Sequence, residues 1–211
     1  MKTNFYVDGF NLYYRAVKGT PFKWLDLLAF CQRLTPSHTV NRIRYFTARI
    51  APRPGNLRGP QRQQTYIRAL ETIPNLQIHY GQFRPRTKTR PLATPIPGLP
   101  SYVRINDTKE KGTDVNLATC LLVDGFNHDY EQAVVVSNDS DFALPINVVR
   151  DQLAIPVGVV NPNVDRKRSA PNELTSAATF VRRLRETTQR NTQFLPTLRD
   201  GRGLINKPSS W

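Results

Sequence analysis

The stretch VVVSNDSDF, residues 134–142, joins a run of three valines to a polar turn that carries two aspartates. An uninterrupted apolar run of this length is typical of a strand buried on both faces, as in a parallel sheet. A second stretch, YVDGFNLYY at residues 6–14, has the same arrangement, because its β-prone start ends at an aspartate. Two such strands predict a sheet whose functional groups gather at the carboxyl ends of its strands.

Three further strands are expected at residues 42–50, 76–80 and 155–160, where β-prone or apolar residues form short runs. Helical spacing of apolar residues predicts helices over 24–34, 60–70, 114–123 and 142–150, with Thr113 as the N-cap of the third. Strands that alternate with helices predict an α/β fold with a five-stranded, mostly parallel sheet and helices on both faces. The common order for such a sheet is 3-2-1-4-5.

Two segments fall outside this alternation. Residues 84–100 carry five prolines and several basic residues, which predicts a long basic loop. From residue 163 the chain turns polar and basic, with one helix expected between Leu174 and Arg190 and a flexible tail at the end. We therefore expect one domain over residues 1–162 and a basic C-terminal helix and tail over 163–211, packed on the domain or extending from it.

The composition points to an acidic partner. The 211 residues include 30 Lys or Arg and 16 Asp or Glu, a net charge of +14. Residues 42–111 hold 14 of the basic residues and only 3 of the acidic ones, and tyrosines are interspersed among the arginines there. Guanidinium groups bind phosphate oxygens in a bidentate manner, so this block predicts binding to nucleic acid. A solvated basic face is the alternative.

Other bulk features concern location. The sequence has no apolar run of membrane-spanning length and no secretory leader at its start, which predicts a soluble, cytoplasmic protein. Cys31 and Cys120 both lie on apolar helical stripes, so buried thiols are expected rather than a disulfide. The sequence leaves the oligomeric state open and is compatible with a homo-oligomer.

Acidic residues concentrate in the next block, residues 112–164, which has 7 acids and 1 base. In the expected strand order, the two acid-bearing strands are neighbours, so Asp8, Asp139 and Asp141 are expected in one crevice. Asp114 begins the preceding helix, whose N-terminus is expected to keep it ionised. Four carboxylates this close would repel one another unless a hard divalent cation, Mg²⁺ or Mn²⁺, lies between them.

Other enzyme classes fit less well. A haloacid-dehalogenase phosphatase needs a second aspartate two residues after its nucleophile, and Phe10 stands at that position. The glycine-rich dinucleotide fingerprint and the phosphate-binding loop are both absent. The three histidines fall on separate expected elements without metal-ligand spacing, which disfavours a histidine-based ribonuclease.

The motifs YVDGFNLYY at 6–14, KGTDVNLA at 111–118 and VVVSNDSDF at 134–142 closely resemble the signatures of the NYN domain, a branch of the PIN-like nuclease superfamily. The resemblance runs from about residue 3 to residue 162. It implies a Rossmann-like PIN fold and a divalent-metal site formed by Asp8, Asp114, Asp139 and Asp141. Members often have Gly where this chain has Asn138, and residues 84–100 and the C-terminal segment lie outside the shared motifs.

Together, these features predict an endoribonuclease that uses Mg²⁺ or Mn²⁺ to hydrolyse single-stranded RNA, leaving a 5′-phosphate and a 3′-hydroxyl. The residues expected to contact the substrate are Asn11, Ser137, Asn138, Lys111, Arg84 and Arg86. The alternative is a non-catalytic RNA-binding module with the same fold. That alternative predicts a lost acid, and none of the four is missing.

Overall fold

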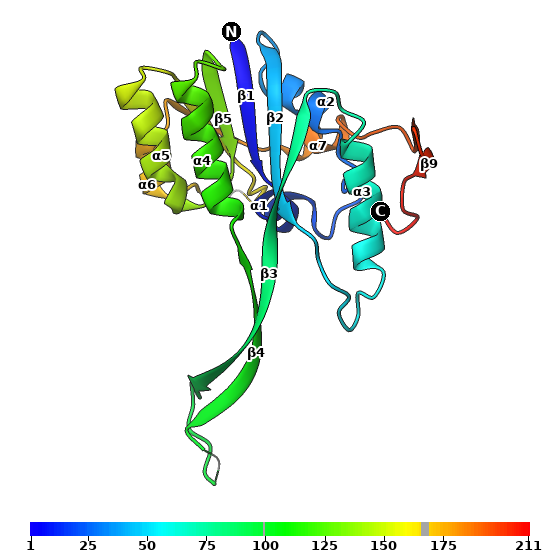
Figure 1. The fold of residues 1–211 in the computed structure, drawn as a ribbon, viewed down its shortest axis with the longest axis vertical. Coiled ribbons are helices and arrows are strands. Elements are labelled where there is room, and N and C mark those ends of the chain that lie inside the picture. Colours follow the sequence, from blue (N-terminus) through cyan, green and yellow to red (C-terminus); the bar gives the residue numbers. More distant parts are fainter. Residues whose placement is uncertain (99, 166–168) are drawn as a thin grey trace.

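The computed structural model describes residues 1–98, 100–165 and 169–211. Its centre is a seven-stranded sheet (Figure 1). From edge to edge the strands are β4 (Tyr102–Lys111), β3 (Leu76–Pro91), β2 (Thr39–Ala48), β1 (Lys2–Asp8), β5 (Gln132–Val136), β6 (Val157–Asn161) and β7 (Phe180–Arg183). All neighbours are parallel except β3 and β4. The five predicted strands therefore have the predicted order, but the count of five is wrong.

Helical segments cover both faces of the sheet (Figure 1). In chain order they are α1 (Gly9–Leu12), the π-helix η1 (Tyr13–Val17), α2 (Leu27–Leu34), α3 (Gly59–Leu70), α4 (Thr113–Phe126), the 3-10 helix η2 (Ser140–Phe142), α5 (Ala143–Asn147), the π-helix η3 (Val148–Gln152), α6 (Asn172–Ala177) and α7 (Glu186–Arg190). Helices α2, α3 and α7 lie on one side of the sheet, and α4, α5 and α6 lie on the other.

The alternation of side chains along β1 produces two cores. Phe5 and Val7 are buried with Trp24 and Phe30 on one face, whereas Tyr6 is buried on the other face with residues of α4 and α5. On this second face Asp124 of α4 accepts a 2.7 Å hydrogen bond from the Tyr6 hydroxyl and a bidentate ion pair from Arg44 of β2. This buried polar contact ties α4 to two strands and thereby orients the helix whose first turn carries Asp114.

The prediction of a basic loop over 84–100 is wrong for residues 84–91, because residues 82–91 form an antiparallel ladder with residues 102–111. This hairpin extends away from the body as a long arm (Figure 1), which we call the hairpin arm, residues 82–98 and 100–111. Each of its strands has one unpaired side, where a proline such as Pro85 or Pro91 costs no ladder hydrogen bond. Residue 99 lies outside the described residues.

The C-terminal segment also differs from the prediction. The single helix expected over 174–190 is replaced by α6, strand β7 and α7, and β7 extends the sheet beside β6. The expected flexible tail instead forms a β-hairpin of β8 (Thr197–Asp200) and β9 (Gly203–Asn206), and Trp211 packs on Trp24. Residues 166–168 of the basic segment lie outside the described residues. Whether a domain boundary falls at residue 162 stays a prediction.

Two remaining predictions concern cysteines and membranes. Cys31 is buried, Cys120 is partly buried, and both are free thiols, as expected. Within the described part of the chain, no helix is both long enough and apolar enough to cross a membrane.

Candidate functional site

Three of the four predicted acids line one cavity of about 490 Å³ at the carboxyl ends of β1 and β5. Asp8 ends β1, Asp139 follows β5, and Asp114 lies in the first turn of α4. Glu110, near the end of β4, adds a fourth carboxylate to the lining. The strand order predicted from the sequence thus brings together acids that are more than 100 residues apart in the chain.

Asp8 is held in place from two sides. One carboxylate oxygen accepts a 2.9 Å hydrogen bond from the backbone N–H of Asn11, and the other accepts a 3.0 Å bond from the Ser137 hydroxyl. The following Gly9 is required by space, since a Cβ there would lie 2.7 Å from the carbonyl oxygen of Phe46. Burial, with smaller contributions from the charges of Asp114 and Asp139, raises the pKa of Asp8 to about 6 even though these two bonds lower it.

Asp139 and Asp141 have different positions although they are two residues apart. Asp139 caps η2 by accepting a 3.1 Å bond from the N–H of Asp141, and its own N–H donates to the Ser137 hydroxyl. Asp139 lines the cavity, whereas Asp141 is exposed and is not among the lining residues. Asp141 still affects the site through its charge, which contributes to raising the pKa of Asp114.

The start of α4 differs from the expected cap. Gly112 is the N-cap, with a left-handed φ of 102° that favours glycine. The Thr113 hydroxyl instead donates a 2.6 Å hydrogen bond to Glu110, which also accepts from the Thr113 N–H. Burial and the charges of Asp139 and Glu110 raise the pKa of Asp114. These contributions act in the opposite direction to the helix N-terminus, which was expected to favour the ionised form of Asp114.

The residues predicted to contact substrate fall into two groups. Asn11, Ser137 and Asn138 lie beside Asp8 and Asp139, and the side-chain oxygens of Asn11 and Asn138 are buried without a hydrogen-bond partner. Lys111 is exposed at the end of β4, and Arg84 and Arg86 are exposed on the hairpin arm. These three cations therefore lie outside the cavity lining.

The structure also adds lining residues that the sequence analysis did not single out. They include Glu110, Phe10, Tyr14, Arg15 and Arg53. Phe10, Tyr14 and Arg15 follow Asp8 on α1 and η1, so their proximity could have been inferred from the helical turn after the strand. Glu110 and Arg53 come from a strand and a loop that the sequence analysis did not place at this edge.

The positions of the described acidic side chains do not by themselves complete a metal site. Within the described part of the chain, no three His, Cys, Asp or Glu side chains are placed to hold a metal ion in this conformation. Their mutual charge effects nevertheless show that they lie within electrostatic range, because Asp114 and Asp139 raise the pKa of Asp8. The cavity therefore gathers four carboxylates, and its lining also includes Arg15 and Arg53.

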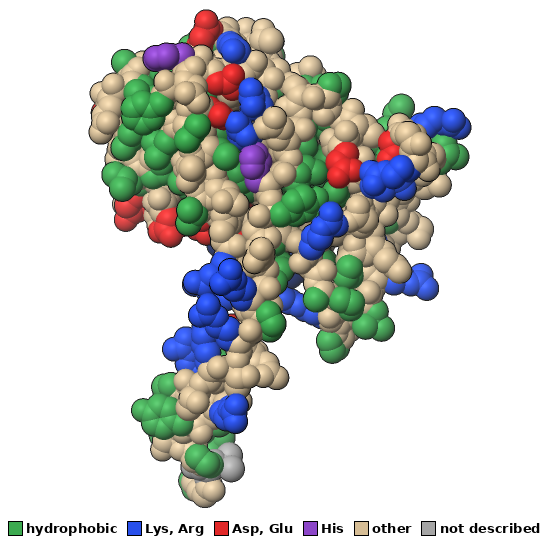
Figure 2. Space-filling model, viewed as in Figure 1, with side chains coloured by type: hydrophobic (Ala, Val, Ile, Leu, Met, Phe, Trp, Pro, Cys, Tyr) green, Lys and Arg blue, Asp and Glu red, His purple; other side chains and the backbone are tan. Residues whose placement is uncertain are grey.

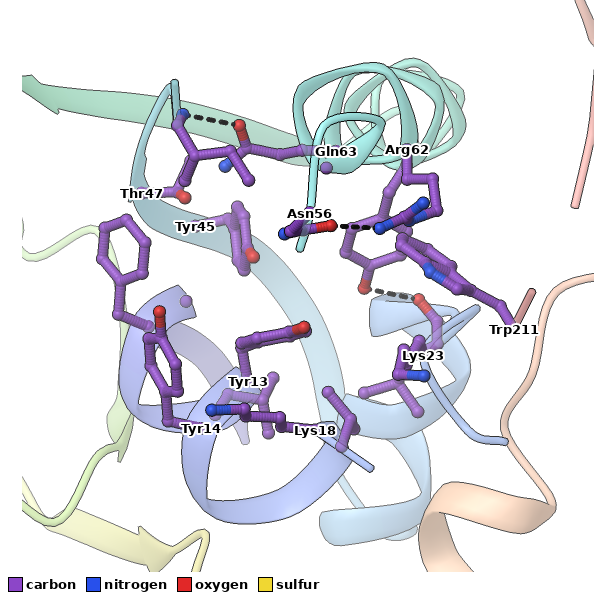
Figure 3. Close-up of a pocket in the computed structure, with 18 of the residues that line it drawn as sticks. Tyr13, Tyr14, Lys18, Lys23, Tyr45, Thr47, Asn56, Arg62, Gln63 and Trp211 are labelled. Carbon is purple, nitrogen blue, oxygen red and sulfur yellow. Dashed lines mark hydrogen bonds between the residues drawn. The ribbon is translucent and has the colours of Figure 1, made fainter. Parts of the chain in front are cut away.

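A second cavity, of about 560 Å³, is lined by residues of α1, η1, β2 and α3 (Figure 3). It is lined by tyrosines, by Trp211 and by the basic side chains of Lys18, Lys23 and Arg62. Among the described residues that line it there is no Asp or Glu. The sequence analysis did not anticipate this cavity, since Trp211 was expected in a flexible tail.

Comparisons with known proteins give a family and a fold. A family model described as the NYN domain matches residues 2–184. The 6-hydroxy-3-succinoylpyridine 3-monooxygenase HspA of Pseudomonas putida is 30% identical over 235 aligned positions, which cover 100% of this chain and 75% of that protein. A crystal structure of a protein of unknown function from Vibrio parahaemolyticus covers 87% of this chain and 92% of its own, with a TM-score of 0.53 and 20% identity.

These matches bear differently on the chain. At 20% identity, the likeness to the Vibrio structure shows the α/β fold alone. The family match extends over nearly the whole chain and includes all three motifs on which the resemblance rested. The chain belongs to the NYN domain family.

Proposed function

We propose that this protein is an endoribonuclease of PIN-like fold that hydrolyses single-stranded RNA with Mg²⁺ or Mn²⁺, and that it acts in the cytoplasm. The observation that carries the proposal is the cavity in which Asp8, Asp114 and Asp139 lie within range of one another's charge. Membership of the NYN family, whose members are generally nucleases, supports it. When bound, the ions would activate water and neutralise charge on the phosphodiester.

The residues present suit a hard divalent cation. Asp8, Asp114, Asp139 and Asp141 would hold it, and all of their ligating atoms are oxygens, as Mg²⁺ and Mn²⁺ prefer. The pKa values of Asp8 and Asp114 are raised by burial and by repulsion from neighbouring carboxylates. The positive charge of a bound cation would offset both effects. The buried, unpartnered oxygens of Asn11 and Asn138 provide further groups that a cation or its water shell could satisfy.

The chain's own groups would position the acids and the strand. Ser137 and the Asn11 N–H fix both oxygens of Asp8, so this carboxylate is oriented before substrate arrives. Arg15 and Arg53 line the same cavity and would contact phosphates beside the scissile bond.

The hairpin arm would bind RNA outside the cavity. Figure 2 shows Lys and Arg side chains along the arm and acidic side chains on the body near its root. Arg84 lies directly opposite Lys109 in the ladder, an arrangement of like charges that a bound polyanion stabilises. Lys88 is already paired with Asp107 and contributes less.

The test is a cleavage assay on end-labelled single-stranded RNA and on DNA of the same sequence. We expect RNA cleavage with Mg²⁺ or Mn²⁺ and none in excess EDTA. Full activity in EDTA would refute the metal-dependent reaction. Binding without cleavage under every metal tested would instead favour the non-catalytic RNA-binding module.

A second candidate function comes from the Pseudomonas relative, which is named as a monooxygenase of a succinoylpyridine and aligns with the whole chain. The cavity lined by aromatic and basic side chains favours this candidate, because a pyridine that bears a carboxylate would fit such a lining. Oxygen uptake with 6-hydroxy-3-succinoylpyridine and a nicotinamide reductant tests it. We expect no uptake above the background, and stoichiometric uptake would replace the ribonuclease proposal.

A further inference from the structure

The second cavity combines flat aromatic surfaces with positive charge. Tyr13 from η1, Tyr45 from β2, Tyr66 from α3 and Trp211 from the C-terminus all border it (Figure 3). Its volume of about 560 Å³ is in the range of small-molecule and cofactor sites. Aromatic side chains are the surfaces on which nucleic-acid bases stack, whatever their identity.

Its charged groups are all basic. Lys18, Lys23 and Arg62 line the cavity, and no Asp or Glu side chain appears among the described lining residues. The Lys18 ammonium lies 5.0 Å from the centre of the Tyr14 ring, so positive charge and aromatic surface are adjacent. A ligand that fits this lining has a planar ring and an anionic group, which is the chemistry of a nucleotide.

The walls are braced before any ligand binds. The Tyr66 hydroxyl donates a 2.8 Å hydrogen bond to the Leu25 carbonyl, and the Tyr66 ring packs edge-on against Trp211 at 6.0 Å. Gln63 holds the loop after β2 by donating to the Ala48 carbonyl and accepting from the Ile50 N–H. Side chains that are already held in place lose less conformational entropy when a ligand binds.

The two cavities share a wall. Phe10, Tyr14, Ile50 and Asn56 line both of them, and Phe10 and Tyr14 stack at 6.5 Å. An RNA strand with one phosphodiester at Asp8 therefore has an adjacent nucleotide within reach of the aromatic cavity. An RNA strand that bound only along the hairpin arm would not contact these aromatic rings.

We propose that the aromatic cavity binds one nucleotide of the substrate strand, next to the phosphodiester at the acidic cavity, by stacking its base on the tyrosine and tryptophan rings and pairing its phosphate with Arg62 and the two lysines. This assignment rests on the proposed ribonuclease function for its place in the reaction. It concerns the base and phosphate of a single nucleotide and does not involve the acids.

The experiment titrates adenosine 5′-monophosphate, uridine 5′-monophosphate and nicotinate into the full-length protein by calorimetry, in EDTA so that no cleavage occurs. We expect both nucleotides to bind, and Arg62→Gln and Tyr13→Ala each to weaken that binding about tenfold or more. The matched control Arg33→Gln, at an exposed position on α2, should leave the affinity unchanged. Tyr13→Phe keeps the ring and should bind like the parent, which tests stacking even if Tyr13→Ala folds poorly.

Three outcomes would overturn the proposal. Nucleotide binding that Arg62→Gln and Tyr13→Ala both leave unchanged would place the ligand elsewhere. Binding of nicotinate without either nucleotide would assign the cavity to small heteroaromatic acids, and binding of none of the three would leave it without this role. Because the titration needs neither metal nor turnover, its result is independent of whether the cleavage assay succeeds.

Discussion

The acidic and the aromatic cavities are built from the same loops and have opposite chemistry. Phe10, Tyr14, Ile50 and Asn56 line both. Among the described lining residues, Asp and Glu occur only in the acidic cavity, whereas the aromatic cavity has further tyrosines, Trp211 and three basic side chains. Carboxylates repel a phosphate unless a cation intervenes, whereas lysine, arginine and aromatic rings attract a nucleotide directly. Under the proposed function, this difference places the reaction in the acidic cavity and nucleotide binding in the neighbouring aromatic cavity.

The largest effect is expected from replacing Asp8, whose two carboxylate oxygens each accept a hydrogen bond. Asp8→Asn should lower the turnover of RNA cleavage by at least about a hundredfold, because it removes a charge that would hold the cation. Binding of adenosine 5′-monophosphate in EDTA should stay unchanged, since Asp8 does not line the aromatic cavity. Cleavage kinetics measure the turnover, and calorimetry measures the binding of the mononucleotide. Asp151→Asn, at an exposed acid on η3, is the control, and equal rates for both variants would make Asp8 a structural residue.

The next effect separates two neighbouring acids. Asp139 lines the acidic cavity and caps η2, whereas Asp141 is exposed, lies outside the cavity lining and raises the pKa of Asp114 through its charge. Asp139→Asn should therefore reduce turnover at least about tenfold more than Asp141→Asn. The comparison is made by steady-state cleavage at saturating Mn²⁺. Identical losses would mean that Asp141 turns into the cavity when a cation binds.

The contribution of the hairpin arm to RNA binding can be measured separately, through the dependence of RNA affinity on salt concentration. Replacing Arg84, Arg86 and Arg90 on the hairpin arm by Ala should remove up to three phosphate contacts. The slope of log affinity against log salt for single-stranded RNA should then flatten by up to about 2.1. Mononucleotide affinity should not change, because none of the three lines the aromatic cavity. Filter binding of RNA at several salt concentrations measures the slope, and an unchanged slope would exclude the arm from RNA binding.

The smallest effect is expected at the wall of the aromatic cavity. Trp211→Ala removes one ring but leaves the tyrosines, so the KM for RNA should rise by up to about tenfold with kcat within about twofold of the parent. The control Leu204→Ala lies at an exposed position on β9 and should change neither constant. A fall in kcat without a change in KM would place Trp211 in the support of the acidic cavity instead.

The sequence was informative where signals are local and repeated. Short apolar runs that end in Asp8 or in Asp139 identify buried strands and their functional ends, and the common order of such strands places these acids side by side. The three motifs that carry them were sufficient to predict the family. These features were predictable because strand alternation and acid placement depend on residues that are close in the chain.

Three parts of the molecule were decided by tertiary structure alone. Prolines between residues 84 and 100 argued for a loop, but a two-stranded arm has a free side on which Pro85 is tolerated, and only the pairing with β4 reveals this. Phe180–Arg183 is too short and polar to predict as a strand, and it becomes one because β6 offers an open edge. Trp211 completes the aromatic cavity by packing on Trp24, which lies 187 positions earlier in the chain. Contacts between residues so distant in the chain leave no periodic signal, so the acids were predictable from the sequence and the cavity beside them was not.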